Sequence, residues 1–287
     1  MILITGARGF VGRSLLRALE REGREVRPFE GHINDLQQLS DALEGVDFVY
    51  HLASAEKRGR PRHLQNIDVQ GTERLIRAAR HVGVQRLVLV SCINADPNSL
   101  FPLLQAKGQA ERLVRQSSIP YTIVRSATLF GLEDRFLNVI ASLAAWSWPL
   151  LWLPGGGTVA TQPLWVEDLA RCLVLLQGRE DLAGETVTVA GEERLRYREL
   201  AQMVTEAAGL TRIPVKVDLR LVRPVWALTM GWWRRPPVTR FFLNRFSIPD
   251  VAPSDSVLHT FGFRPERLGD HLAFLRRAGI RGRLFRL

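Results

Sequence analysis

The first half of the chain alternates between short apolar runs and segments whose apolar residues recur every three or four positions. Five of the runs are expected to be strands, at residues 1–4, 25–29, 46–52, 86–90 and 121–124. The segments between them are expected to contain helices, at residues 14–19, 39–43, 67–79 and 105–115. The runs VDFVYHL and RLVLV are almost continuously apolar, as in parallel strands buried on both faces. The pattern therefore predicts an α/β fold, a Rossmann-like doubly wound parallel sheet.

The middle of the chain holds an uncharged stretch at residues 136–154. Its length would suit a membrane span. Pro149 and three polar side chains interrupt it, however, and three glycines end it at residues 155–157. A buried helix followed by a tryptophan-rich loop is therefore the favoured interpretation, although the indoles would also suit a lipid headgroup interface. These tryptophans are Trp146, Trp148 and Trp152.

Two domains are expected. Residues 1–190 are predicted to form the Rossmann domain, and residues 191–287 a smaller, mainly helical C-terminal lobe to which residues 132–160 contribute. The net charge of +10 lies entirely in the last quarter of the chain: residues 1–211 hold 24 basic and 24 acidic residues, and residues 212–287 hold 15 and 5. This asymmetry predicts an anionic partner for the C-terminal lobe, which could be a membrane surface, an acidic protein or nucleic acid.

Candidate chemistry begins at the first strand, which runs into the glycine turn TGARGFVG at residues 5–12. A glycine turn between a strand and a helix is the context that binds a dinucleotide. Gly6 would allow the tight turn, Gly9 a close approach of a pyrophosphate, and Gly12 close packing of helix on strand. The helix N-terminus would then offer N–H groups to the phosphates. Ligands of such sheets bind beyond the carboxyl ends of the strands, where Gly9, Ala53 and Ser91 are expected to cluster.

The choice between NAD and NADP stays open. Glu30 follows the second strand, 24 residues after Gly6, where an acidic side chain would bind ribose hydroxyls and disfavour a 2′-phosphate. Arg8 and Arg27 could do the opposite. The two cysteines, Cys92 and Cys172, lie 80 residues apart without metal-ligand spacing, so no metal is expected. They also favour a reducing compartment, and Met1 opens directly into a strand without a signal peptide, so a cytoplasmic location is predicted.

Several segments, taken in order, resemble the extended and atypical short-chain dehydrogenase/reductases. After TGARGFVG come HLA at 51–53, NIDVQGT at 66–72, VS at 90–91, YTIVRSATLFG at 121–131, QPLWVEDLA at 162–170 and GETVTVAG at 184–191. The resemblance covers about 200 residues and implies a Rossmann domain that holds NAD or NADP. The cofactor-binding residues that it and the turn imply are Gly6, Arg8, Gly9, Phe10, Val11, Gly12, Glu30, Ile33, Leu52, Ala53 and Lys107.

The departures from this family bear on activity. Its enzymes use a tyrosine four residues before a lysine; the phenol exchanges a proton with the substrate, and the lysine holds the nicotinamide ribose. Lys107 is present, but Leu103 stands four residues earlier and cannot act as acid or base. The family's serine corresponds to Ser91 or, preferably, Cys92. His32 stands where the family often has an aspartate near the adenine, in a region shortened to GHINDLQQ.

The C-terminal pattern is similar to that of the nucleotide-binding accessory subunit of respiratory complex I and its bacterial relatives. A helix is expected near residues 221–233, followed by PPVTRFFLNRF and VLHTFGFRPERLGDHLAFL. Tryptophan and arginine gather there and would suit an anionic lipid surface or a protein interface. These residues are Trp226, Trp232, Trp233, Arg234 and Arg235, and the basic tail at 276–287 is expected to add a contact arm. Burial of the tryptophans in a core stays open as well.

Three functions remain open. The favoured one is an NAD(P)-binding, non-catalytic accessory or assembly protein at a membrane-bound electron-transfer complex, peripheral at the inner face of the membrane. The second is an NAD(P)H-dependent reductase or epimerase in which Lys107 and Cys92 replace the usual apparatus. The third, a redox-sensing regulator that binds nucleic acid through its basic lobe, ranks last because no recognition motif is present.

Overall fold

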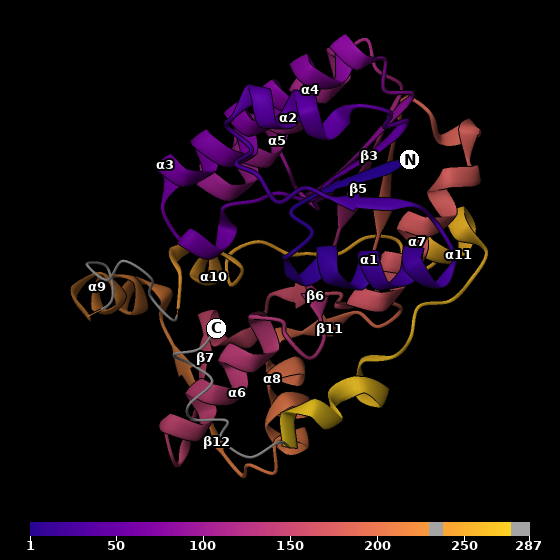
Figure 1. Ribbon diagram of the computed structural model, residues 1–287. Coiled ribbons are helices and arrows are strands. Elements are labelled where there is room, and N and C mark those ends of the chain that lie inside the picture. The colour runs from indigo at the N-terminus through magenta and orange to yellow at the C-terminus, as the bar shows by residue number, and fades with distance from the viewer. Residues whose placement is uncertain (230–237, 277–287) are drawn as a thin grey trace. The chain divides into compact units, whose positions relative to one another are not determined.

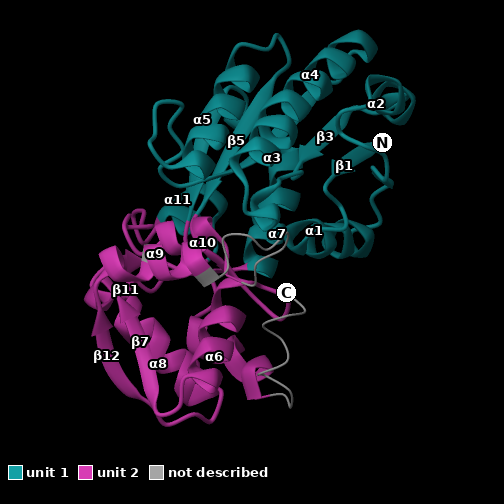
Figure 2. Cartoon of the chain, turned by 90° about the vertical axis from the view of Figure 1, so that its left-hand side faces the viewer, with its two compact units in different colours: residues 1–126, 166–189, 256–263 teal, residues 127–165, 190–255, 264–287 magenta. Residues whose placement is uncertain are grey.

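A computed structural model describes residues 1–229 and 238–276 (Figure 1). The chain divides into two compact units, each assembled from separate stretches of sequence (Figure 2). Unit 1 consists of Met1–Ser126, Val166–Val189 and Ser256–Phe263. Unit 2 consists of Ala127–Trp165, Ala190–Asp255 and Arg264–Leu287.

Unit 1 is built on a six-stranded sheet in the order β10-β5-β4-β3-β1-β2, and every pair of neighbouring strands is parallel. The strand order reverses around β1, because β2 lies on one side of it and β3 on the other. This is the topological switch point at which doubly wound sheets bind ligands. The strands are β1 (Ile2–Thr5), β2 (Val26–Pro28), β3 (Phe48–His51), β4 (Arg86–Cys92), β5 (Tyr121–Ser126) and β10 (Glu185–Val189).

Helices cover both faces of this sheet (Figure 1). On one face α2 packs against α4 and α4 against α5, and on the other α1 packs against α7. The first face encloses a core of fully buried side chains that includes Leu3, Leu39, Val49, Leu75 and Leu87. The helices of this unit are α1 (Phe10–Arg21), α2 (Leu36–Leu43), α3 (Pro61–Leu64), α4 (Gln70–Val82), α5 (Pro102–Arg115), α7 (Val166–Leu175) and α11 (Ser256–Phe261).

The predicted fold class is confirmed, with local differences. The sheet has a sixth strand, β10, in the segment 184–191, which the periodicity did not predict as a strand. The expected helix at 67–79 begins as a π-helical turn, η2 (Gln65–Val69), and continues as α4. The sheet ends at β2, and the shortened region after it leads directly to α2, where Asp35 accepts a hydrogen bond from the Gln38 N–H as N-cap. A side-chain N-cap of this kind fixes where a helix begins.

Unit 2 surrounds a second core, in which α6 (Phe136–Trp146) packs on α8 (Tyr197–Ala207). In the described part of this unit, three short strand pairs accompany these helices, and one of them, β7 (Leu150–Pro154) with β12 (Ile213–Val217), is parallel over five residue pairs. The other pairs are β6 (Leu129–Phe130) with β9 (Leu164–Trp165), and β8 (Ala160–Thr161) with β11 (Leu195–Arg196). The remaining described elements are α9 (Leu219–Thr229), α10 (Arg240–Asn244) and the 3-10 segments η3 (Gly155–Gly157) and η6 (Leu268–Arg276).

The uncharged stretch at 136–154 is a buried helix, as favoured, but its last part differs from the expectation. Residues 150–154 are the strand β7 and not a loop, because Leu151 and Leu153 alternate into the core while Trp152 faces outward. Over residues 1–229 and 238–276, no helix has the length and apolar character needed to span a membrane.

The expected C-terminal helix near residues 221–233 is present in the described region as α9 (Leu219–Thr229), and the rest of the expected range lies outside the described residues. Trp226, for which the sequence leaves an interface and a core position open, packs partly buried against the core of unit 2, and its indole N–H donates to the carbonyl of Val238 at 2.7 Å. It is therefore used inside the unit. The other residues of the expected cluster (Trp232, Trp233, Arg234 and Arg235) and the tail after Arg276 lie outside the described residues.

Candidate nucleotide-binding site

The glycine turn between β1 and α1 has no room for side chains. Gly6 has φ +72°, and a Cβ placed on it would lie 2.8 Å from the backbone nitrogen of Ala53. A Cβ on Gly9 would lie 3.0 Å from the Gly6 carbonyl oxygen, and one on Gly12 only 2.3 Å from the same oxygen. Gly12 therefore allows the first turn of α1 to rest directly on the glycine turn.

Helix α1 presents an open N-terminus above this turn. Gly9 is the N-cap and supplies no side-chain cap, and no acidic residue lies in the first turn, which begins with Phe10 and Val11. The first N–H groups of a helix have no partner within the helix and carry the positive end of its dipole. A glycine cradle with such donors fits a diphosphate.

Arg8 and Glu30, which had been weighed as opposing determinants of NAD and NADP binding, are paired with each other. The Arg8 guanidinium donates to the Glu30 carboxylate at 2.8 Å, and both side chains are largely exposed. An exposed pair of this kind contributes little stability and can rearrange around a ligand. Arg27 is engaged elsewhere, because it donates to the carbonyls of Ala42 and Glu44 near the end of α2.

Ile33 and Leu52 occupy inner positions beside the switch point. Ile33 is buried, and a Cβ on Gly71 of α4 would lie 3.0 Å from its side chain, so Ile33 packs against that helix. The Leu52 N–H donates to the Thr5 carbonyl at 3.1 Å, which extends the pairing of β1 and β3 up to the glycine turn. The structure thus brings Leu52 and Ala53 against Gly6.

His51 lies directly beneath the turn and is fully buried between two threonines. Its Nδ1 is 2.6 Å from the Thr5 hydroxyl, and its Nε2 is 2.9 Å from the Thr72 hydroxyl. Thr72 donates its one hydrogen to the Asp68 carbonyl, so we assign Nε2–H as the donor to Thr72 and Nδ1 as the acceptor from Thr5. Burial, followed by the charge of Lys107, lowers the pKa of His51 to about 3.

This burial predicts sensitivity to acid. The pKa of His51 is about 3 in the folded protein and near 6.5 in the unfolded chain. Its contribution to the free energy of unfolding is therefore fully present above pH 6.5 and decreases as the pH falls, by up to about 5 kcal/mol in total. We expect His51→Gln to lower stability at pH 7 and to flatten the fall between pH 6.5 and 4.5. Urea unfolding at a series of pH values measures both.

Asp134 has the opposite effect on how stability depends on pH, so the contribution of His51 is given by the difference between variant and wild type. Burial raises the pKa of this carboxyl to about 7, so its contribution weakens stability as pH rises from about 4 to 7. Asp134 is present in both proteins and cancels in the difference. Equal pH slopes for wild type and His51→Gln would show that His51 is protonated in the folded state.

Lys107 projects from α5 into the interior of unit 1, and only 9% of the residue is exposed. Lys107 is therefore not a surface lysine. Its ammonium lies 3.1 Å from a carboxylate oxygen of Asp68, a residue of the π-helical turn that is 1% exposed. The other Asp68 oxygen accepts the N–H of Ala55, just beyond β3, at 2.8 Å.

The charge of Lys107 is maintained in this setting. Burial alone lowers the pKa of its ammonium, but the nearby Asp68 and Cys92 outweigh burial, and the pKa of Lys107 is raised overall. Lys107 is therefore an ammonium at neutral pH, and it is balanced by a buried carboxylate. Asp68 was not recognised from the sequence, although it lies within NIDVQGT; an acidic residue at the start of an amphipathic helix is the signal that was available.

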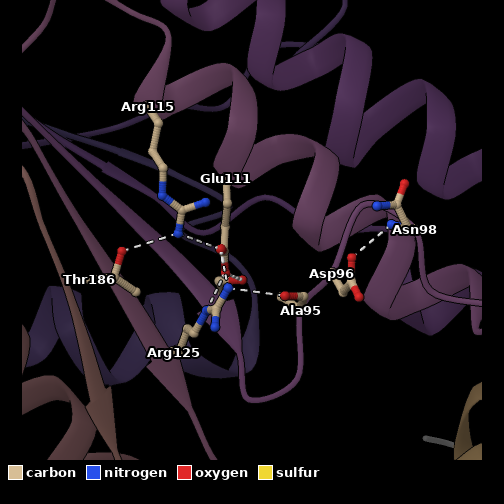
Figure 3. A network of polar contacts seen from close by, with 8 residues as sticks. Ala95, Asp96, Asn98, Glu111, Arg115, Arg125 and Thr186 are labelled. Atoms are coloured by element: carbon tan, nitrogen blue, oxygen red, sulfur yellow. Dashed lines mark hydrogen bonds and ion pairs between the residues drawn. The ribbon is translucent and has the colours of Figure 1, made fainter.

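Ser91 lies near the carboxyl end of β4, the strand beside β3, which leads to Ala53. It donates to the buried carboxylate of Glu111 at 2.6 Å, so its hydroxyl is used beneath α5. Glu111 also accepts from Arg115 at 2.9 Å and from Arg125 at 2.6 Å, and Figure 3 shows the two guanidiniums converging on it. The network joins β4, β5 and α5, and Arg125 extends it to the carbonyl of Ala95.

Glu111 is a second residue that sequence reasoning missed. It lies four residues after Lys107, so both occupy the same face of α5. A carboxylate among the small and apolar residues of that face, Ala106, Ala110 and Val114, was the available signal. Cys92, favoured as the counterpart of the family's serine, lies at the end of β4 and is close enough to raise the pKa of Lys107.

No tyrosine replaces the phenol that Leu103 lacks. Tyr50 is fully buried and donates to the carbonyl of Leu173 at 2.6 Å. Tyr121 begins β5, at the amino end of the sheet, and Tyr197 is buried in the core of unit 2. Within the part of the chain that the structure describes, no group of three or more His, Cys, Asp or Glu side chains is placed to hold a metal ion.

Comparison with known proteins agrees with this geometry. Residues 6–135 match the family model described as NAD(P)H-binding. The chain is 26% identical over 254 residues to the 40 kDa subunit of mitochondrial NADH-ubiquinone oxidoreductase from Neurospora crassa, covering 80% of this chain and 66% of that subunit. It is 30% identical over 250 residues to subunit 9 of the NADH dehydrogenase 1 alpha subcomplex from Arabidopsis thaliana, covering 77% and 62%. The chain thus spans less than two thirds of both relatives.

A reductase and a solved structure extend the comparison. The 2-alkyl-3-oxoalkanoate reductase of Stenotrophomonas maltophilia is 24% identical over 313 residues, covering 92% of this chain and 94% of that enzyme. The structure of MoeE5 in complex with UDP-glucose and NAD is similar with a TM-score of 0.73 and 24% identity, covering 96% and 97% of the two chains, which shows a shared fold.

The glycine cradle, the parallel sheet and these matches define the class: the chain carries an NAD(P)-binding domain of Rossmann-like fold. In sequence it is similar both to subunits of NADH-ubiquinone oxidoreductase and NADH dehydrogenase and to a reductase.

Proposed function

We propose that this protein is a non-catalytic accessory or assembly protein that holds NAD(P) and docks at a membrane-bound electron-transfer complex, peripheral at the inner face of the membrane. The observation that carries the proposal is Leu103, which stands four residues before Lys107. The short-chain dehydrogenase/reductases that the sequence resembles have their proton-donating tyrosine at this position. A leucine supplies no proton, so the bound nucleotide stabilises the protein and is not consumed.

The proposed cofactor contacts follow from the cradle. The diphosphate lies over Gly9 at the N-terminus of α1, with the first N–H groups of that helix as donors. Glu30 serves the adenosine ribose at the end of β2, and Lys107 serves the nicotinamide half beyond β4. The remaining expected contacts, Arg8, Ile33, Leu52 and Ala53 among them, line the switch point between these ends.

Docking is supported by exposed apolar side chains on unit 2. We call them the apolar strip; they are Trp146, Trp148, Trp152, Ile213, Leu221, Val225 and Leu228. Trp148 is 73% exposed and Leu228 80%. Apolar residues exposed singly are common on soluble proteins, whereas apolar residues that share one surface mark interaction sites.

The apolar strip follows from the local structure. In the parallel pair of β7 and β12, Trp152 and Ile213 lie on the side that faces away from the core. Helix α9 continues from β12, and its exposed Leu221, Val225 and Leu228 are spaced four and three residues apart, on one helical face. The elements α9, β7 and β12 are labelled in unit 2 of Figure 2.

The chemistry of the partner follows from charge and from similarity. Residues 212–287 carry 15 basic and 5 acidic residues, so an acidic protein surface complements them. Tryptophan beside arginine is typical of the anchors of protein interfaces. The relatives in Neurospora and Arabidopsis are subunits of mitochondrial NADH-ubiquinone oxidoreductase and NADH dehydrogenase, so we infer a protein subunit of an electron-transfer complex as the partner.

The experiment changes the strip and leaves the core intact. The test variant combines Leu221→Ser, Val225→Ser and Leu228→Ser. When cell membranes are sedimented, we expect most of the wild-type protein that binds a membrane complex to be recovered in the pellet, and most of this variant to stay in the supernatant. The same variant should bind the nucleotide and unfold on heating as the wild type does, because the altered side chains are exposed. Leu100→Ser, which changes a leucine of unit 1 that is 96% exposed, is the matched control and should sediment like the wild type.

The outcomes separate the possibilities. Loss of sedimentation with protein-containing membranes, but not with protein-free anionic vesicles, supports docking to a protein. Equal loss with both identifies lipid as the partner and overturns the protein assignment. Unchanged sedimentation of the variant, or a wild-type protein absent from membranes, rejects docking through this strip.

A reductase or epimerase is the second candidate. Similarity over 94% of the Stenotrophomonas reductase and the buried ammonium of Lys107 favour it. Oxidation of NADH or NADPH with a panel of carbonyl compounds, abolished in Lys107→Ala, would establish this activity and reject the non-catalytic assignment.

A further inference from the structure

We propose that Asp68 tunes which redox form of the nucleotide the site prefers, by cancelling the positive charge of Lys107 beside the nicotinamide half. The proposal rests on the proposed NAD(P) site but not on docking or on the absence of turnover. Without Asp68, the lone ammonium would repel the cationic oxidised ring and favour the neutral reduced ring. With Asp68, the oxidised nucleotide can be held as well.

The topology places the pair beneath the nicotinamide half. A dinucleotide lies across the switch point, with its diphosphate at the N-terminus of α1 and its adenosine ribose beside the acidic residue after the second strand. Here that residue is Glu30, beyond β2, on one side of β1. The other half must extend beyond β3 and β4, on the opposite side of β1. Ala55 follows β3, and the Asp68 carboxylate accepts its N–H.

The two charges are close, buried and held from different elements. The Lys107 ammonium comes from α5, and the Asp68 carboxylate from the π-helical turn before α4, with 3.1 Å between them. One Asp68 oxygen is fixed by the Ala55 N–H, and the other has no hydrogen-bond partner of good geometry besides the ammonium. Nearby His51 adds no charge because it is neutral at physiological pH.

The low polarity of the interior increases the effect of the Lys107 and Asp68 charges on a bound nucleotide. Coulomb energies between charges are several times larger in a protein interior than in water, so removing one member of a buried pair exposes a neighbouring ligand to an uncompensated charge. The oxidised nicotinamide carries one more positive charge than the reduced ring. The ratio of their dissociation constants therefore reports the net charge of the pair and is independent of contacts that both forms share.

The test measures dissociation constants by calorimetry with the full chain, for NAD⁺ and NADH and for NADP⁺ and NADPH. We expect Asp68→Asn to raise the ratio of oxidised to reduced dissociation constants on the order of tenfold. Lys107→Met should move the ratio in the opposite direction, and the double variant should return it towards the wild-type value. The charge-preserving Lys107→Arg should leave the ratio unchanged even if both affinities fall.

An uncompensated buried charge can prevent folding. If Asp68→Asn does not fold, the opposite shift in Lys107→Met and the unchanged ratio in the double variant decide the proposal. Ratios that stay equal to the wild type, or that move the same way in both single variants, overturn it while leaving the proposed function standing. Turnover by the wild type would reject the non-catalytic assignment without touching this ratio.

Discussion

Replacing Gly12 by alanine is expected to weaken nucleotide binding by roughly a hundredfold or more, equivalent to about 2.7 kcal/mol. A Cβ at this position would lie 2.3 Å from the Gly6 carbonyl oxygen and 2.6 Å from that of Ala7. These are backbone atoms of the turn, so the clash cannot be relieved by moving a side chain. Helix α1 would have to shift away, taking its N–H donors out of line with the diphosphate.

The same substitution should lower the free energy of unfolding by about 1–3 kcal/mol, as expected for overpacking. Calorimetry with NADH and NADPH, together with urea unfolding, gives both quantities. Gly178→Ala is the matched control, because a Cβ on Gly178 meets no atom within 4 Å and that glycine also belongs to unit 1. Wild-type affinity in Gly12→Ala would place the nucleotide elsewhere in the molecule.

Replacing Glu111 by glutamine is expected to destabilise the protein by about 3–5 kcal/mol, the usual cost of breaking a buried ion pair by removing one partner. Glutamine keeps the shape of the side chain but not its charge. Arg125, which donates to both Glu111 oxygens, and Arg115 would lose the carboxylate that balances them (Figure 3). Urea unfolding of wild type and variant measures the difference.

The control for this prediction is Glu73→Gln, which removes an exposed carboxylate that pairs with Arg77 on the surface of α4. A pair of that kind contributes less than about 1 kcal/mol. If Glu111→Gln cost no more than Glu73→Gln, the two arginines would have to find other partners or water, and the network could not be a principal connection between β4, β5 and α5.

Local patterns predicted the parallel sheet well because each strand is short, apolar and bounded by polar turns. One edge strand of the sheet was not predicted. β10 reads ETVTV, which alternates polar and apolar residues, and only its pairing with β5 shows that it completes the sheet. Likewise, residues 150–154 have the same apolar composition as the helix before them, and their pairing with β12 decides that they form a strand.

The residues of the candidate site were predicted where short spacings identify them and missed where distant segments meet. The spacing of the glycines at residues 6, 9 and 12 predicts the nucleotide-binding turn, because each of these positions requires the absence of a side chain. Lys107 could be placed only through the family resemblance, because its burial depends on how α5 packs. Its partner Asp68 is 39 residues away in sequence, at positions 68 and 107, and nothing local connects the two.

The sequence by itself determined the alternation of strands and helices, the glycine turn, the absence of a tyrosine before Lys107 and the basic C-terminal quarter. These are properties of single residues and of short spacings. Only the tertiary structure decided that Asp68 balances Lys107, that Glu111 gathers two arginines and Ser91, and that Trp226 is used in a core while Trp148 faces water. Each depends on which distant segments meet, and charge balance and burial arise only where they do.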